Sequence, residues 1–209
     1  MSQHPFQRLA RKAEKLLGTH APIAPLVAKI GRCTLVPSEQ PFAALVRSVL
    51  AQLISTAAAK SITNKLMVTL KDELTPKAVL ALEDDEFRAS GVSRGKVKTL
   101  RGVAELFASR RGLEAELLAM DDAAVRDTLL PLHGIGPWTV DMFLIFVLGR
   151  PDVLPVGDLG VRAGAKDAFQ MAELPTAAEL TALAEPWRPY RTIASWYLWR
   201  SRGWVPQSE

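Results

Sequence analysis

The residue with the clearest chemical potential is an aspartate at the junction between a loop and an expected helix. Asp158 follows Pro-Val-Gly and precedes Leu-Gly-Val-Arg. Aspartate at such a junction is a preferred N-cap, because its carboxylate accepts hydrogen bonds from the first amides of the helix. The same position can present the carboxylate at the mouth of a cleft, where it could stabilise positive charge or orient water. Both interpretations stand, since a cap also fixes the direction of its own side chain.

A glycine-framed turn upstream of this aspartate could bind an anion. Residues 130–139 read Leu-Pro-Leu-His-Gly-Ile-Gly-Pro-Trp-Thr, so Gly134 and Gly136 flank one isoleucine and Pro137 suits a first helical position. The first amides of a helix have no intrahelical partner and, together with the helix dipole, favour a phosphate oxygen. The alternative is an ordinary turn between two packed helices.

Aromatic and basic side chains form two further groups. Four tryptophans are interleaved with arginines near the C-terminus: Trp187, Trp196, Trp199 and Trp204 with Arg188, Arg191, Arg200 and Arg202. This pattern suits stacking on bases and contact with phosphates, but a tryptophan-rich terminal helix is also typical of a core. The segment Ser93-Arg94-Gly95-Lys96 starts another expected helix, and it could hold a phosphate or be a solvated helix end.

Composition limits the classes of function. The chain has 209 residues, of which 48% are hydrophobic and 23% charged, as expected for a soluble protein of one domain or two small lobes. Its apolar runs fall short of the roughly 18 residues that a membrane helix needs, and we expect a cytoplasmic protein. A net charge of +4 permits a polyanionic partner without demonstrating one. A single cysteine, Cys33, and three histidines exclude an internal disulfide, a cysteine-ligated iron–sulfur cluster and a histidine-based metal cluster.

Helix signals dominate the elements that must position these residues. From Phe42 to Leu53 the apolar residues recur at helical spacing, which predicts a helix. By residue type alone, Leu53 and Ile54 at its end would lie in the core. Strand signals are poor, so we expect an all-α protein. Helix caps are expected at Thr75, at Asp84 or Asp85, at Ser93 and at Asp121 or Asp122. Further helices are expected at 57–70, 93–110, 137–148, 159–170, 176–185 and 189–202.

Taken in order, these segments resemble the helix-hairpin-helix DNA glycosylases, and among them the bacterial 3-methyladenine-DNA glycosylase II type, here in a short form without the extra N-terminal domain. The segments that carry the resemblance are 49–55, 93–96, 132–139, 155–158 and 186–190, with Trp196-Tyr197. The resemblance implies two helical lobes with the helix-hairpin-helix motif and an active-site cleft between them. Residues 41–149 would form one lobe, and residues 1–40 with 150–209 the other.

The activity implied is that of a monofunctional glycosylase of base excision repair. Such an enzyme flips an alkylated base of the 3-methyladenine or 7-methylguanine type out of duplex DNA and hydrolyses its N-glycosidic bond, leaving an abasic site. Asp158 would be the catalytic carboxylate, and Leu53 the wedge, with Gln52 as the alternative. Trp138 and Trp196 would form the base pocket, with Tyr190 and Trp187 as second choices.

The resemblance also implies how the DNA backbone is held. The phosphate-binding residues would be Gly134, Gly136, Trp138, Thr139, Ser93 and Lys96. A Na⁺ or K⁺ ion would bind the carbonyls of Leu130, Leu132 and Ile135, and no other cofactor is expected. The partner would be double-stranded DNA containing alkylated bases, bound by a monomer in the nucleoid of the cytoplasm, with no membrane contact.

The larger enzymes of this type have an additional N-terminal β-containing domain, so the resemblance leaves the range of lesions open. Two positions of this chain also bear on its activity. Trp138 stands where relatives that also cleave the strand have a lysine, so no lyase activity is expected. Many short relatives have Gln-Gln in place of Gln52-Leu53, which leaves the wedge open between these neighbours. Two other functions remain: a glycosylase for deaminated or mispaired bases, and a non-catalytic helix-hairpin-helix DNA-binding protein.

Overall fold

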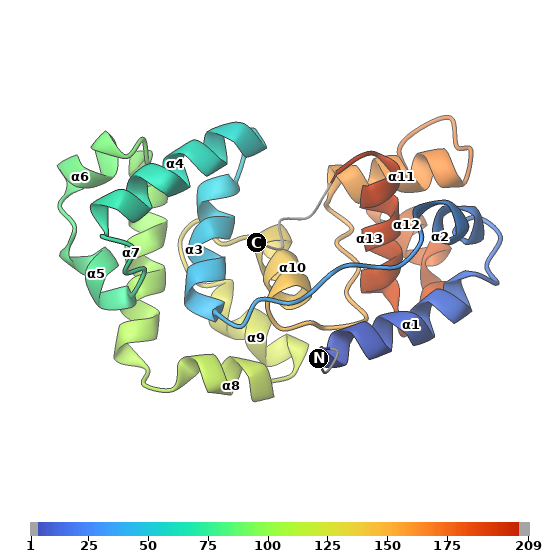
Figure 1. The fold of residues 1–209 in the computed structure, drawn as a ribbon, viewed down its shortest axis with the longest axis horizontal. Coiled ribbons are helices and arrows are strands. Elements are labelled where there is room, and N and C mark those ends of the chain that lie inside the picture. Colours follow the sequence, from blue (N-terminus) through green and yellow to red (C-terminus); the bar gives the residue numbers. More distant parts are fainter. Residues whose placement is uncertain (1–3, 205–209) are drawn as a thin grey trace. The chain divides into compact units, whose positions relative to one another are not determined.

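The computed structural model describes residues 4–204, and over this range the chain forms α-helices and one short 3₁₀ helix, without a strand (Figure 1). The prediction of an all-α protein is therefore confirmed. The chain divides into two compact units, Glu39–Phe143 and Met1–Ser38 with Leu144–Glu209, each of which has its own core.

In the unit formed by Glu39–Phe143, α7 (Arg94–Ser109) is the helix on which its neighbours pack. It contacts α3, α5 and α6, while α4 packs on α3 (Figure 1). The buried face of α7 includes Val97, Leu100 and Phe107, whose spacing of three and seven residues keeps them on one side of the helix. The other helices are α3 (Pro41–Ala51), α4 (Thr56–Thr69), α5 (Pro76–Ala81), α6 (Asp84–Ala89), α8 (Leu113–Ala119), α9 (Asp122–Leu129) and α10 (Pro137–Phe146), which ends beyond the unit boundary.

Most expected helix starts in this unit are correct. The hydroxyl of Thr75 accepts from the Ala78 amide at 3.2 Å, and the carboxylate of Asp121 accepts from the Ala124 amide at 2.8 Å. The expected N-cap at Asp84 or Asp85 is wrong, because Asp84 is already the first residue of α6. Glu83 takes the N-cap position, and its amide donates to the Glu86 carboxylate at 2.8 Å.

The first expected helix of this unit is shorter than its apolar pattern predicts. α3 ends at Ala51, and Gln52 turns away from the helix with ψ 132°. Leu53 then adopts a left-handed backbone with φ +58° and is fully exposed, so it does not lie in the core as its residue type alone would indicate, and its role as the wedge stays a prediction. The apolar pattern extends beyond the end of α3 because Leu53 and Ile54 are apolar residues that are not buried.

In the other unit, α13 (Arg191–Ser201) is the central helix, in contact with α11 (Leu159–Ala168), α2 (Ala24–Ile30) and α1 (Pro5–Leu17). Every residue from Thr192 to Trp199 is buried, so this part of α13 has no exposed face. The unit also contains α12 (Ala177–Leu183) and the 3₁₀ helix Glu185–Trp187. Helices α1, α2 and α8 were not predicted from the sequence.

A glycine and an ion pair fix the surroundings of α13. A Cβ added to Gly164 of α11 would lie 2.7 Å from the carbonyl oxygen of Leu198, so the two helices approach each other more closely than a side chain would allow. At its first residue, Arg191 donates through Nε to the carboxylate of Asp152 at 2.7 Å. The ion pair holds the start of α13 beside the loop that leads to Asp158, and the approach at Gly164 places α13 against α11, which Asp158 caps. Over residues 4–204, no helix is long and apolar enough to span a membrane.

Candidate functional site

The glycine-framed turn is a hairpin between α9 and α10. Gly134 has φ +75°, and a Cβ added to it would lie 2.2 Å from Oγ1 of Thr99 on α7. Only glycine therefore fits here, both for its backbone conformation and for its contact with α7. Ile135, at the tip, is buried, and it anchors the turn in the core of its unit.

Helix α10 starts directly after this turn, at Pro137. Its first hydrogen bond to the turn joins the amide of Val140 to the carbonyl of Gly136 at 3.1 Å. The amides of a first helical turn point out of the helix, which is the geometry that binds an anion. Gly134 and Gly136 shape the approach to this helix start. Phosphate binding by these residues and by Trp138 and Thr139 stays a prediction.

The hairpin is bonded to the segment that follows α3. The side-chain amide of Gln52 donates to the carbonyl oxygen of Gly134 at 3.1 Å and to the hydroxyl oxygen of Thr139 at 2.8 Å. The ammonium group of Lys96 donates to the carbonyls of Leu50 at 2.6 Å and Gln52 at 3.0 Å. The structure thus brings together candidate residues that the sequence analysis had assigned to two different roles, phosphate binding and wedge.

Ser93 lies close to Lys96 in the chain, as the exposed N-cap of α7. Burial lowers the pKa of Lys96 below its ordinary value, because its ammonium group is partly removed from water. The charge of Lys96 therefore faces carbonyl oxygens within its own unit. Lys96 was selected from the sequence as a basic residue, and no sequence signal indicates these acceptors.

Asp158 lies in the other unit, where it caps α11. Its Oδ1 accepts from the amide of Val161 and from the indole nitrogen Nε1 of Trp199, both at 2.8 Å. The capping interpretation is thus correct, and the indole bond adds a second constraint on the same oxygen. A carboxylate oriented in this way is suited to stabilise positive charge on a neighbouring group.

Trp199 is a functional candidate that the sequence analysis did not select. In the sequence it is one of several C-terminal tryptophans, and its spacing from Asp158 carries no signal of contact. Its ring also lies 4.9 Å from that of Trp204 and 5.6 Å from that of Phe146, measured between centroids. Trp204 is 39% exposed, so this cluster extends from the buried Trp199 to the surface.

The other aromatic candidates differ in exposure. Trp187 and Trp196 are 1% and 2% exposed, respectively, whereas Trp138 and Tyr190 are partly exposed. Trp196 packs edge-on against Tyr197, and the guanidinium of Arg200 lies 5.6 Å from the centre of its ring. Trp138 is therefore more accessible to a ligand than Trp187 or Trp196. The base-pocket roles of all four remain predictions.

Binding of a monovalent cation by the hairpin carbonyls stays a prediction. The carbonyl of Leu132 accepts from the Ile135 amide at 3.1 Å, which leaves a second lone pair for a cation. Leu130 and Ile135 would supply the other carbonyls, and neutral oxygens suit Na⁺ or K⁺. Among residues 4–204, no group of three or more histidine, cysteine and acidic side chains could hold a metal ion.

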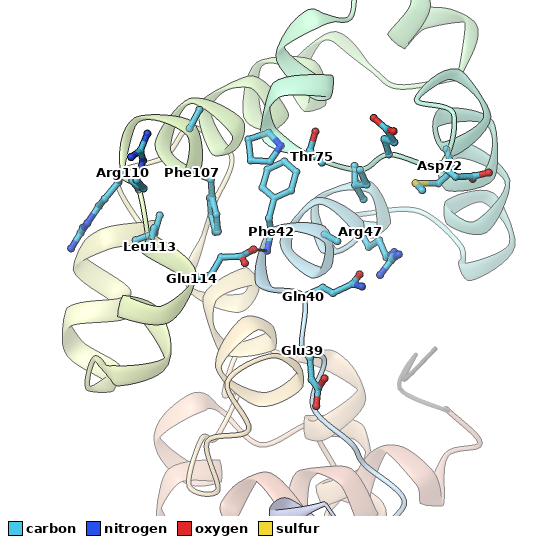
Figure 2. Close-up of a pocket in the computed structure, with 18 residues that line it drawn as sticks. Glu39, Gln40, Phe42, Arg47, Asp72, Thr75, Phe107, Arg110, Leu113 and Glu114 are labelled. Carbon is cyan, nitrogen blue, oxygen red and sulfur yellow. Dashed lines mark hydrogen bonds between the residues drawn. The ribbon is translucent and has the colours of Figure 1, made fainter.

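A cavity of the Glu39–Phe143 unit lies apart from the hairpin. Its volume is about 720 Å³, and Figure 2 shows Phe42, Phe107, Arg47 and Glu114 around it. The carboxylate of Glu114 accepts from the Phe42 amide at 3.2 Å, at the start of α3, whereas Gln52 follows its end. None of the residues predicted from the sequence to act in catalysis or DNA binding lines this cavity.

Comparison with known proteins gives a consistent set of similarities. The family model described as "HhH-GPD superfamily base excision DNA repair protein" matches residues 46–189. The alkylbase DNA glycosidase-like protein mag2 of Schizosaccharomyces pombe is 33% identical over 181 residues, which cover 84% of this chain and 85% of the relative. DNA-3-methyladenine glycosylase 1 of the same yeast is 34% identical over 170 residues, which cover 78% of this chain and 73% of the relative.

A solved structure is also similar over nearly the whole chain. It contains the S. pombe 3-methyladenine DNA glycosylase Mag1 in complex with abasic DNA, and it matches with a TM-score of 0.82 at 30% sequence identity. The match covers 95% of this chain and 100% of the other. The similarity therefore includes both units of the fold.

Proposed function

Because this chain belongs to the HhH-GPD superfamily of base excision DNA repair proteins, we propose that it is a DNA glycosylase specific for alkylated bases. It hydrolyses the N-glycosidic bond of a base flipped out of duplex DNA and leaves an abasic site. The relatives named as 3-methyladenine glycosylases support this substrate class, as does the similar structure with abasic DNA.

The observation that carries the proposal is the oriented carboxylate of Asp158. Cleavage of a glycosidic bond passes through a sugar with oxocarbenium character, and a fixed carboxylate stabilises that positive charge. The same carboxylate can orient the water that attacks the sugar. The bonds from Val161 and Trp199 to Oδ1 hold Asp158 in one orientation before any substrate binds, so no energy is needed to order it during the reaction.

The chemistry of the leaving base explains why one carboxylate is enough. A methyl group on a purine ring nitrogen makes the base cationic, so it can leave without a general acid. A cationic ring is also attracted to the faces of aromatic side chains. Trp138 is partly exposed at the start of α10, and the cluster of Phe146, Trp199 and Trp204 borders Asp158. Both offer such faces.

The residue type of Trp138 also favours hydrolysis without strand cleavage. A lyase needs an amine that forms a Schiff base with the sugar, and Trp138 cannot supply one. We therefore expect an abasic product with an intact strand. The hairpin at Gly134 and Gly136 would hold a DNA phosphate, and a monovalent cation on its carbonyls would add positive charge there without sequence specificity. This protein would act on chromosomal DNA in the nucleoid, as a monomer.

The decisive experiment compares the protein with an Asp158→Asn variant. Purified protein should release methylated purines from alkylated duplex DNA, and the variant should release them at least about 100-fold more slowly. Binding of the variant to a duplex with an abasic-site analogue should persist, because the asparagine still caps α11 and the hairpin is intact. Absence of base release by the unaltered protein, or undiminished release by the variant, would refute the proposal.

Two alternatives are separated by the same assay. A non-catalytic DNA-binding protein would bind the abasic analogue but release no base in a single-turnover reaction. A glycosylase for deaminated or mispaired bases would release uracil or hypoxanthine faster than methylated purines. The second alternative is disfavoured because a neutral leaving base needs hydrogen-bond donors that an aromatic pocket does not supply.

A further inference from the structure

The segment between α3 and α4 combines an exposed apolar side chain with a strained backbone. Leu53 has φ +58° and is 104% exposed, relative to its reference state. A left-handed conformation costs a non-glycine residue about 1 kcal/mol or more, and an exposed leucine gains nothing from burial. Such a conformation persists only where the surrounding structure imposes it.

The side chains of Lys96 and Gln52 hold the turn in which Leu53 has this conformation. Lys96 reaches from α7 to the carbonyls of Leu50 and Gln52, at the C-terminal end of α3. Carbonyls at a helix C-terminus have no intrahelical partner and carry the negative end of the helix dipole, so an ammonium group is a strong donor there. These bonds end α3 at Ala51 and fix the direction in which the chain leaves it.

Gln52 connects the same turn to the hairpin. Its side-chain amide donates to Gly134 and Thr139, so the residue directly before Leu53 is tied to the start of α10. All four hydrogen bonds lie within the Glu39–Phe143 unit, and they join α3, α7 and the hairpin. Because the side chain of Gln52 is occupied by these bonds, it acts as a support and Leu53 is the side chain presented outward.

We propose that Lys96 and Gln52 are positioning residues that hold Leu53 for insertion into the base stack at a fixed distance from the phosphate-binding hairpin. This proposal rests on the proposed function, because a wedge is needed only by an enzyme that flips bases. Binding of the backbone at the hairpin then places Leu53 directly, and no ordering of the 52–55 segment is required at the moment of insertion. The assignment differs from that of the sequence analysis, in which Lys96 binds a phosphate and Gln52 is an alternative wedge.

The functional test measures single-turnover excision of a methylated base in two contexts: paired in a duplex, and opposite an abasic-site analogue, where less stacking must be broken. Lys96→Met should slow excision of the paired base roughly tenfold, the effect of one hydrogen bond to a charged group. It should have much less effect opposite the abasic analogue. In a Leu53→Ala background, Lys96→Met should add little, because it acts through Leu53. Equal slowing in both contexts, or full additivity with Leu53→Ala, would overturn the proposal.

Three controls separate positioning from other roles. Lys96→Arg retains the charge and donors and should recover most of the activity lost in Lys96→Met. Lys98→Met removes an exposed charge from the same helix and should slow excision less than Lys96→Met. Removal of a phosphate ligand, by contrast, would lower the magnitude of the slope of log affinity against log salt concentration for undamaged DNA by about one unit. That outcome for Lys96→Met would assign Lys96 to the DNA backbone and overturn the proposal.

A structural measurement keeps the test independent of catalysis. Amide hydrogen exchange at residues 52–55 should be faster in Lys96→Met and in Gln52→Leu than in Lys98→Met, while exchange in the core of α7 stays unchanged. If the unaltered protein released no base but exchange changed as expected, the proposed function would fail and the support of the 52–55 turn would stand. Unchanged exchange at 52–55 in both variants would overturn the positioning role, whatever the activity.

Discussion

The indole nitrogen of Trp199 donates a hydrogen bond to Oδ1 of Asp158 at 2.8 Å, and it thereby joins the central helix α13 to the start of α11. The amide of Val161 donates to the same oxygen. Trp199 is itself 1% exposed and packed against Phe146 and Trp204, so its ring is held by the core. The direction of the carboxylate is therefore set by packing as well as by the helix cap.

The first prediction concerns this bond. Trp199→Phe keeps an aromatic ring but removes the donor, so Asp158 will be less well oriented, and single-turnover excision should fall about tenfold with little change in binding to abasic DNA. The matched test is the pair of substitutions Asp158→Asn and Trp199→Phe together. If the indole acts only through the carboxylate, the double variant should be no slower than Asp158→Asn alone. Further slowing would mean that Trp199 contacts the base or the sugar directly.

The second prediction concerns the specificity of the base pocket. Trp138→Ala removes a partly exposed aromatic face, and it should reduce excision of a cationic base such as 7-methylguanine more than that of a neutral base. The expected selective loss is roughly tenfold, measured as the ratio of single-turnover rates on the two lesions. Trp138→Phe is the control, because it retains a ring and should keep most of the preference. An equal loss on both lesions would instead indicate a role in DNA binding.

Several helix ends were predictable from a cap or a glycine, although the cap of α6 at Glu83 was not. Thr75, Asp121 and Gly134 are examples, because local chemistry alone decides them. The residue type of Leu53 alone favours the core, and its exposure could not be predicted from periodicity, since the exposure of a single apolar side chain depends on contacts made by distant residues. The bond between Trp199 and Asp158 and those from Lys96 to the end of α3 join residues far apart in the chain, and composition and periodicity contain no information on such pairs.

The third prediction uses the single thiol. Burial raises the pKa of Cys33 to about 12, and its side chain is 1% exposed, so the native protein should not react with iodoacetamide at pH 8. The thiol should react at the rate of a free cysteine in denaturant. Mass spectrometry of the alkylated chain measures both rates, and the native rate then reports the opening of the unit around Cys33. Rapid alkylation of the native protein would contradict the buried position.

The fourth prediction concerns the ion pair that links the two helices of the hairpin motif. Arg126 on α9 donates to the carboxylate of Asp141 on α10 at 2.6 Å, and the Asp141 side chain is 10% exposed. Arg126→Met leaves this carboxylate without its cation and should destabilise the protein by about 1–2 kcal/mol, measured by urea unfolding. The partial exposure of Arg126 keeps the value below that of a fully buried pair. Arg126→Lys should retain part of the stability.

The dependence of this effect on pH has a definite sign. Burial raises the pKa of Asp141 above its ordinary value, although Arg126 opposes the shift. In the Arg126→Met variant the folded-state pKa of Asp141 rises further, so the folded protein binds a proton more tightly than the unfolded chain. The variant should therefore be closest to the unaltered protein below the ordinary pKa of aspartate and lose stability as the pH rises through the folded-state pKa. A deficit that grew on acidification would contradict this assignment.

The fifth prediction tests the fit of the hairpin against α7. Gly134→Ala places a methyl group 2.2 Å from Oγ1 of Thr99 at φ +75°, so both a clash and backbone strain arise, and the protein should lose about 2 kcal/mol. Adding Thr99→Ala removes the clash but not the strain. The double variant should therefore be more stable than the sum of the single effects predicts, as measured by urea unfolding. If the two losses were simply additive, the approach of Gly134 to Thr99 would not limit the hairpin. A shifted hairpin also displaces the acceptors of Gln52, so Gly134→Ala should slow base excision even where the folded fraction is unchanged.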